Sequence, residues 1–160
     1  MLDRSRTWGR PRLAYRDVAS AANRLTLIAA IVPCGSVTVH TLFCLKTTLS
    51  ETDQDFLCGV FNSFVANYLV RLRVTMHVTT HVIANLPVPR PAVSSPLYAA
   101  ISDLTAKLRG SPSPQLEPEY AALQAAVAHL YQLTADELAH ILSTFPLVDG
   151  ATREETMKRF

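Results

Sequence analysis

The stretch that decides the fold is FLCGVFNSFVANYLVRL, residues Phe56–Leu72. Its large apolar residues recur at the spacing of an α-helix: Phe56, Leu57, Val60, Phe61, Phe64, Val65, Tyr68, Leu69 and Leu72. A second, narrower line of small and polar residues is spaced by four: Gly59, Ser63, Asn67 and Arg71. The pattern predicts one long, strongly amphipathic helix.

Segments on both sides of this helix favour β-structure. Arg12–Ala19, Leu25–Pro33 and Ser36–Leu45 are predicted strands, since they combine β-branched and aromatic residues with polar breaks. Thr75–Ile83 is a predicted fourth strand. Four prolines then force an extended elbow out of the sheet, because proline neither donates to a ladder nor continues a helix: Pro87, Pro89, Pro91 and Pro96.

Beyond the elbow the pattern is helical throughout. One helix runs to Gly110, a second covers Tyr120–Tyr131, and capping-box spacings at Thr134/Glu137 and Thr152/Glu155 predict two more. We therefore expect an α+β fold in which a small, mostly antiparallel sheet packs on the long helix and a C-terminal helical subdomain follows. The expected division is an α+β domain of residues 1–90 and a helical subdomain of residues 91–160.

Composition limits the functional classes. The chain has 160 residues, of which 49% are hydrophobic and 18% charged, as in a folded protein with extensive burial. Its aliphatic runs are far shorter than the roughly 20 residues that cross a bilayer, so no membrane association is expected. The three cysteines lack the spacing of a zinc site or a disulfide framework, and no secretory leader is recognisable, which favours the cytoplasm.

Charge is distributed unevenly along the chain. Residues 1–90 hold ten Arg and Lys against five Asp and Glu, a net +5, whereas residues 91–160 hold five against eight, a net −3. Arginines crowd the first segment: Arg4, Arg6, Arg10, Arg12, Arg16 and Arg24. Because guanidinium groups bind phosphates and guanine edges through paired hydrogen bonds, the front half is a candidate nucleic-acid face. The alternative is a chance excess of solvated surface arginines.

No set of residues in the sequence has the pattern of an active site. His77 and His81 are four apart, but no third ligand lies nearby, so no metal site is expected. Cys58 lies inside the apolar stripe, where a cysteine behaves as a small hydrophobe rather than a nucleophile. A glycine-rich phosphate loop is also missing. These features argue against an enzyme.

The order of elements resembles a known family. "FNSFVANYLVRLRV", a β-branched segment and "IANLPVPRP" before helices resemble the C-terminal target-recognition region of adenine-specific DNA methyltransferases, especially bifunctional type II restriction enzymes. The layout is also similar to the recognition domains of type I specificity subunits. The resemblance covers residues 12–160. The Asn-Pro-Pro-Tyr type catalytic motif, the glycine-bearing cofactor loop and the nuclease residues of that family do not occur in this sequence.

The resemblance implies a DNA target-recognition fragment of a restriction-modification or phage-defence system, without catalysis of its own. Its partners would be double-stranded DNA and a methyltransferase catalytic domain or subunit, and S-adenosylmethionine would bind that catalytic domain rather than this chain. The candidate DNA contacts are Arg12, Arg16, Arg24, Arg71, Arg73, Thr79 and His81. Arg90, at the elbow, could meet either DNA or a carboxylate. The rival interpretation is a protein-interaction module whose apolar helices dock on a missing catalytic domain.

Overall fold

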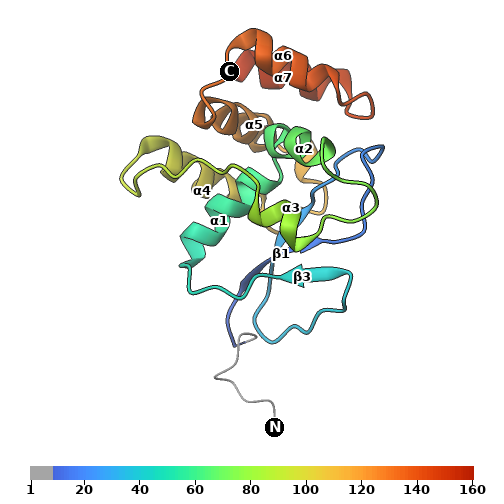
Figure 1. Cartoon of the computed structure of the whole chain (residues 1–160). Helices are drawn as coiled ribbons and strands as arrows, with labels where there is room; N and C mark the ends of the chain where they lie inside the picture. The colour runs from blue at the N-terminus through green and yellow to red at the C-terminus, as the bar shows by residue number, and fades with distance from the viewer. Residues whose placement is uncertain (1–8) are drawn as a thin grey trace.

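A small antiparallel sheet lies at one end of the molecule and helices form the rest (Figure 1). The computed structural model describes residues 9–160. The strands are β1 (Arg12–Arg16), β2 (Ala29–Val32) and β3 (Leu42–Cys44), in the order β2-β1-β3. Central β1 is antiparallel to both neighbours, with Arg12 opposite Val32 and Ala14 opposite Cys44. The predicted α+β class is confirmed.

The strands are shorter than their β-propensity predicts. Of the expected strand Ser36–Leu45, only β3 pairs in the sheet, and Val37 before it is 77% exposed. In the expected strand Leu25–Pro33, the backbone of Thr26 and Leu27 bonds to a helix side chain instead of a strand. A high β-propensity means that a residue fits a paired, half-buried strand surface. These segments have no partner strand, so they do not extend the sheet.

The predicted single long helix is two helices, α1 (Glu51–Phe61) and α2 (Phe64–Arg71). Ser63 has an extended backbone between them, and its hydroxyl caps α2 by accepting the N–H of Ala66 at 3.1 Å. The N–H of Phe64 donates to the side-chain oxygen of Gln124 at 2.7 Å, outside the helical ladder. The break is therefore stabilised by local capping and by one distant amide.

Buried side-chain amides attach the helix pair to the sheet. The Asn67 oxygen accepts the N–H groups of Thr26 and Leu27, each at 2.8 Å, and its amide nitrogen donates to the Leu27 carbonyl at 3.2 Å. Asn62 bonds both backbone groups of Ala29, at 3.0 and 2.9 Å, as a neighbouring strand would. Backbone groups that have no partner strand therefore bond to asparagine side chains. Buried N–H and C=O groups need such hydrogen-bond partners.

The predicted strand Thr75–Ile83 is wrong. Its second half is the short helix α3 (Thr80–Ala84), and its first half makes one isolated bridge, between His77 and Val18. Thr79 caps α3 by accepting the N–H of Val82 at 3.3 Å. The buried residues of this region recur every four positions rather than every two, which is a helical pattern: Val74, Val78, Val82 and Leu86.

Beyond the proline elbow the chain is helical, as predicted. The remaining elements are α4 (Pro96–Leu108), the 3-10 turn η2 (Pro114–Leu116), α5 (Pro118–Leu130), α6 (Ala135–Ser143) and α7 (Gly150–Arg159). The capping box of Thr134 and Glu137 is confirmed at the start of α6. The one predicted at Thr152 and Glu155 is wrong, because Asp149 caps α7 and accepts the N–H of Thr152 at 2.7 Å.

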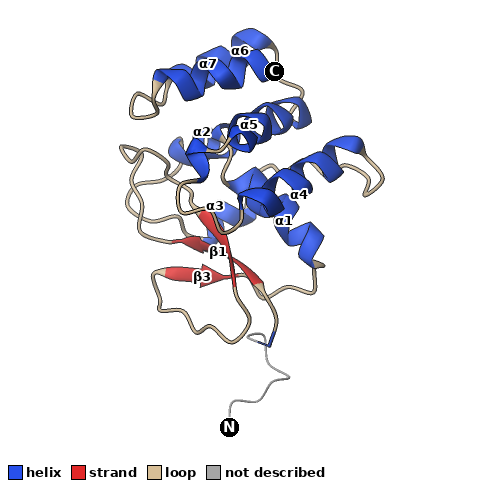
Figure 2. Cartoon of the chain, turned by 180° about the vertical axis from the view of Figure 1, so that it is seen from behind, coloured by secondary structure: helices blue, strands red, loops and turns tan. Residues whose placement is uncertain are grey.

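The core consists of two clusters that share the helix pair α1–α2. Figure 2 shows this pair between the strands and the α6–α7 helices. One joins Phe56, Val60 and Phe64 to α4–α7, and the other joins Phe61 and Val70 to β1 and the α3 region. Because both clusters need α1 and α2, the division at residue 90 stays a prediction. None of the helices in residues 9–160 is long and apolar enough to cross a membrane.

Candidate nucleic-acid interface

Three segments meet where β1 ends, at Asp17. The Asp17 N–H donates to the carbonyl of Thr41, just before β3, at 2.9 Å. The Asp17 carbonyl accepts the N–H of Val78, from the α2–α3 connection, at 2.8 Å. The Asp17 carboxylate lies 2.9 Å from Nδ1 of His77. These bonds fix the α2–α3 connection against the sheet.

The α2–α3 connection exposes polar side chains together with the apolar Leu72 and Met76, while its valines face the core. Val74 and Val78 are buried. On both sides of these valines lie exposed residues with donor and acceptor groups, which together we name the β1-exit surface: Arg73, Thr75, His77, Thr79, Thr80 and His81. The buried valines hold these side chains in place on the protein surface.

The β1-exit surface lies in a stretch without acids. No Asp or Glu occurs between Asp55 and Asp103 in the sequence. Asp17, the carboxylate at this surface, is already paired with His77. The Arg73 side chain has no hydrogen bond or ion pair within residues 9–160. A surface of this composition favours an anionic partner.

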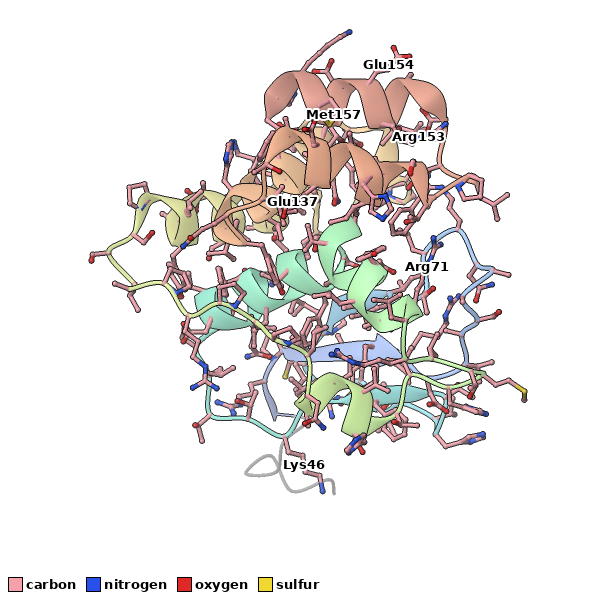
Figure 3. The ribbon with its side chains drawn as sticks, turned by 45° about the horizontal axis from the view of Figure 1, so that its top comes forward. Lys46, Arg71, Glu137, Arg153, Glu154 and Met157 are labelled. Carbon is pink, nitrogen blue, oxygen red and sulfur yellow. The ribbon has the colours of Figure 1, made fainter. Side chains whose placement is uncertain are left out.

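Exposed cations also lie outside the β1-exit surface: Arg10, Lys46 and Arg90. Figure 3 shows Lys46 at the sheet end, whereas Arg153 and Glu154 lie together on α7 at the opposite end.

Three of the seven predicted contact residues lie on the β1-exit surface: Arg73, Thr79 and His81. Thr79 uses its hydroxyl to cap α3, which orients that end of the helix. His81 is exposed on α3, and its Nδ1 lies 3.3 Å from the amide nitrogen of Asn85.

Arg71 is used inside the protein. Its guanidinium donates to Thr144 O at 2.8 Å, to Arg24 O at 3.0 Å and to the carbonyl of Asn23. Its Cζ also lies 3.9 Å from the centroid of the Phe145 ring. Figure 3 shows this side chain at the end of α2. Because its donors are occupied, we remove Arg71 from the candidate DNA contacts.

The three predicted arginines of the first segment, Arg12, Arg16 and Arg24, are also partly or wholly buried. Arg12 is only 8% exposed and donates to the Ser36 carbonyl at 2.5 Å. Arg16 is half-buried and directed to the Leu25 carbonyl at 3.4 Å, and Arg24 lines a cavity beside β2. The crowded arginines of the first segment do not form one continuous guanidinium face in the described chain. Arg4 and Arg6 lie outside the described residues.

Cys58 has the environment of a structural cysteine. It is buried, its Sγ lies 3.5 Å from the Asn62 amide nitrogen, and burial raises its thiol pKa to about 12. At neutral pH the reactive thiolate is therefore scarce. Within residues 9–160, no three His, Cys, Asp or Glu side chains gather as a metal site would require.

This burial predicts a selective thiol reaction. In the native protein, exposed Cys34 reacts with a thiol reagent such as dithionitrobenzoate, whereas Cys58 stays unreacted until the protein unfolds. Timed labelling followed by peptide mass spectrometry measures both sites, and Cys34 is the internal control. Fast native labelling of Cys58 would instead show an accessible, reactive thiol, as a nucleophilic cysteine would have.

The comparisons with protein-family models, curated proteins and solved structures gave no match to this chain.

Sequence reasoning missed the meeting point of Asp17, Thr41 and His77, because it depends on which segments pair. The sequence did hold one signal, the long acid-free run after Asp55. Because this run contains the β1-exit residues, none of its own side chains places a carboxylate beside them.

Proposed function

We propose that this chain recognises double-stranded DNA as the target-recognition part of an adenine-specific methyltransferase in a restriction-modification or phage-defence system. The observation that supports the proposal is the β1-exit surface, which presents Arg73, His77, Thr79 and His81 without a free carboxylate beside them. The sequence resemblance to target-recognition regions supports it independently.

The physical roles divide by residue type. Arg73 neutralises a phosphate and sets the register on the duplex, since guanidinium groups bind phosphate oxygens through paired hydrogen bonds. The threonines and His81 offer short donors and acceptors to base edges, which carry the sequence information. Base flipping and S-adenosylmethionine binding belong to a separate catalytic domain or subunit. We place this assembly in the cytoplasm, where Cys34, Cys44 and Cys58 stay as free thiols.

The proposal predicts a local effect of Arg73. Arg73→Gln weakens binding to a fluorescent duplex about three- to tenfold at moderate salt and lowers the salt slope by about one, as loss of one phosphate contact does. Fluorescence anisotropy measures both quantities. The matched control is Arg159→Gln, another exposed arginine, which pairs with Glu155 on α7 and leaves binding unchanged. Equal effects of the two substitutions would contradict an interface at the β1-exit surface.

A second function is favoured by one observation. An apolar groove of about 520 Å³ lies between α1, α3 and the elbow, with Phe56, Leu57 and Val88 in its walls and Arg90 among its lining residues. Such a groove suits docking on a methyltransferase catalytic domain, and there Arg90 would meet a carboxylate of that partner. Failure of the full chain to bind duplex DNA at low salt would favour this protein-interaction role over DNA recognition.

A further inference from the structure

A cavity of about 340 Å³ lies beside β2, away from the β1-exit residues. It is bounded by β2 and the loop before it, by α1, by the end of α4 and by the start of α5. Strand β2 is an edge strand, and within residues 9–160 no further strand pairs with its outer side. The volume is at the small end of the range for ligand sites, about 300–1,000 Å³.

The walls of this cavity are mostly apolar. Ile28, Ala30, Cys58, Leu108 and Leu123 contribute to them. Cys58 adds no charge, because burial raises its thiol pKa to about 12. An apolar group that enters the cavity therefore displaces water from apolar walls, and this favours its binding.

Two arginines also line the cavity, and they differ in their partners. Arg109 donates to the carboxylate of Asp55, so an internal acid balances its charge. Arg24 has no side-chain hydrogen bond or ion pair within residues 9–160. Hydrogen bonds from Thr152 lower the pKa of Asp149, and the nearby positive charge of Arg24 lowers it by a smaller amount. Both Asp149 oxygens already accept hydrogen bonds from Thr152, at 2.7 Å each.

Tyr120 supplies a second unsatisfied polar group. It lines the same cavity, is 5% exposed, and its hydroxyl has no hydrogen-bond partner in the described chain. A buried hydroxyl without a hydrogen-bond partner is unfavourable. A ligand in the cavity that accepts a hydrogen bond from Tyr120 would remove this cost. Burial raises the Tyr120 pKa to about 12, so at neutral pH the hydroxyl can donate.

We propose that this cavity binds a small apolar monocarboxylate. The hydrocarbon or aromatic body lies between β2 and the helices, and the carboxylate pairs with Arg24. The Arg24 guanidinium has no directly bonded acid in the described chain, and its planar donors fit the two oxygens of one carboxylate. The inference does not depend on DNA recognition, because none of the lining residues belongs to the β1-exit surface.

The test is a titration of the full chain with 2-naphthoate, followed by amide chemical shifts in two-dimensional NMR. We expect saturable shifts confined to residues 28–31, 58–62 and 108–115. The neutral analogue 2-naphthalenemethanol binds about tenfold more weakly, as loss of a charge-assisted hydrogen bond predicts. Arg24→Gln weakens naphthoate by a similar factor, whereas the matched control Arg159→Gln leaves it unchanged.

A second variant keeps the test decisive if Arg24→Gln disturbs folding. Ala30 is exposed and lines the cavity, so Ala30→Phe places a ring in the space and abolishes naphthoate binding. The inference is overturned if naphthoate produces no saturable shift, if the shifts lie elsewhere, or if the neutral alcohol binds equally well. Duplex binding by the β1-exit surface is expected to be the same with and without naphthoate.

Discussion

Asn67→Ala lowers the free energy of unfolding by roughly 3–5 kcal/mol, because it leaves several buried backbone groups without partners. The wild-type side chain is 0% exposed and bonds the N–H groups of Thr26 and Leu27 and the carbonyl of Leu27. Alanine also leaves a void between α2 and the segment before β2. Urea denaturation followed by circular dichroism measures the loss.

The matched control for this substitution is Asn85→Ala. The Asn85 side chain donates to the carbonyl of His81, four residues earlier. Because Asn85 is exposed, water replaces this bond when the side chain is removed. The control loses less than about 1 kcal/mol. A similarly small loss for Asn67→Ala would show that the buried amides do not hold the helix pair to the sheet.

Gly59→Ala lowers the free energy of unfolding by about 1–3 kcal/mol, although alanine is the better helix former. A Cβ at residue 59 would lie 2.2 Å from Thr105 Oγ1, and 3.0 Å from a methyl carbon of Ile101. Thr105 is held by its own bond to the Ile101 carbonyl at 2.7 Å. Helices α1 and α4 would therefore have to move apart. Thermal and urea denaturation measure this loss.

Two variants separate this clash from other effects of the substitution. Gly150→Ala, at the start of α7, meets nothing within 4 Å and leaves stability unchanged or slightly higher. Thr105→Ala removes the clashing oxygen, so the double variant Gly59→Ala/Thr105→Ala is more stable than the sum of the single losses predicts. Strict additivity would contradict a direct contact between residues 59 and 105.

Local signals in the sequence predicted the fold class and much of the helical part. The capping box at Thr134 needs only four residues. Pro96, expected in the extended elbow, is instead the first residue of α4, a position that the fixed backbone angle of proline suits. The misplaced cap of α7 shows the limit of such signals. Asp149 and Thr152 are both residue types that cap helices, and in the structure Asp149 is the cap and accepts the N–H of Thr152.

Features that depend on distant partners could not be predicted. The break between α1 and α2 uses Gln124, which is 60 residues from Phe64 in the sequence. The expected strand after α2 has only one pairing, the bridge between His77 and Val18. Its second half forms α3 instead, with Thr79 as the N-cap.

The same limit applies to the candidate site. Whether an arginine points to DNA or to the interior depends on carbonyl groups that the fold brings near it. Thr144, for example, is 73 residues from Arg71. Sequence alone therefore identified the basic half of the chain but not which of its guanidinium groups are free.

The most direct test of DNA recognition is duplex binding by the full chain as a function of salt. Arg73 on the β1-exit surface and the exposed cations Arg10, Lys46 and Arg90 elsewhere in residues 9–90 are the candidate phosphate contacts. With two or more phosphates neutralised, the logarithm of the affinity falls linearly with the logarithm of salt, with a slope of about −2 or steeper. We predict this slope in fluorescence anisotropy with a mixed-sequence duplex. No binding at low salt, or binding independent of salt, would contradict recognition of DNA by this protein.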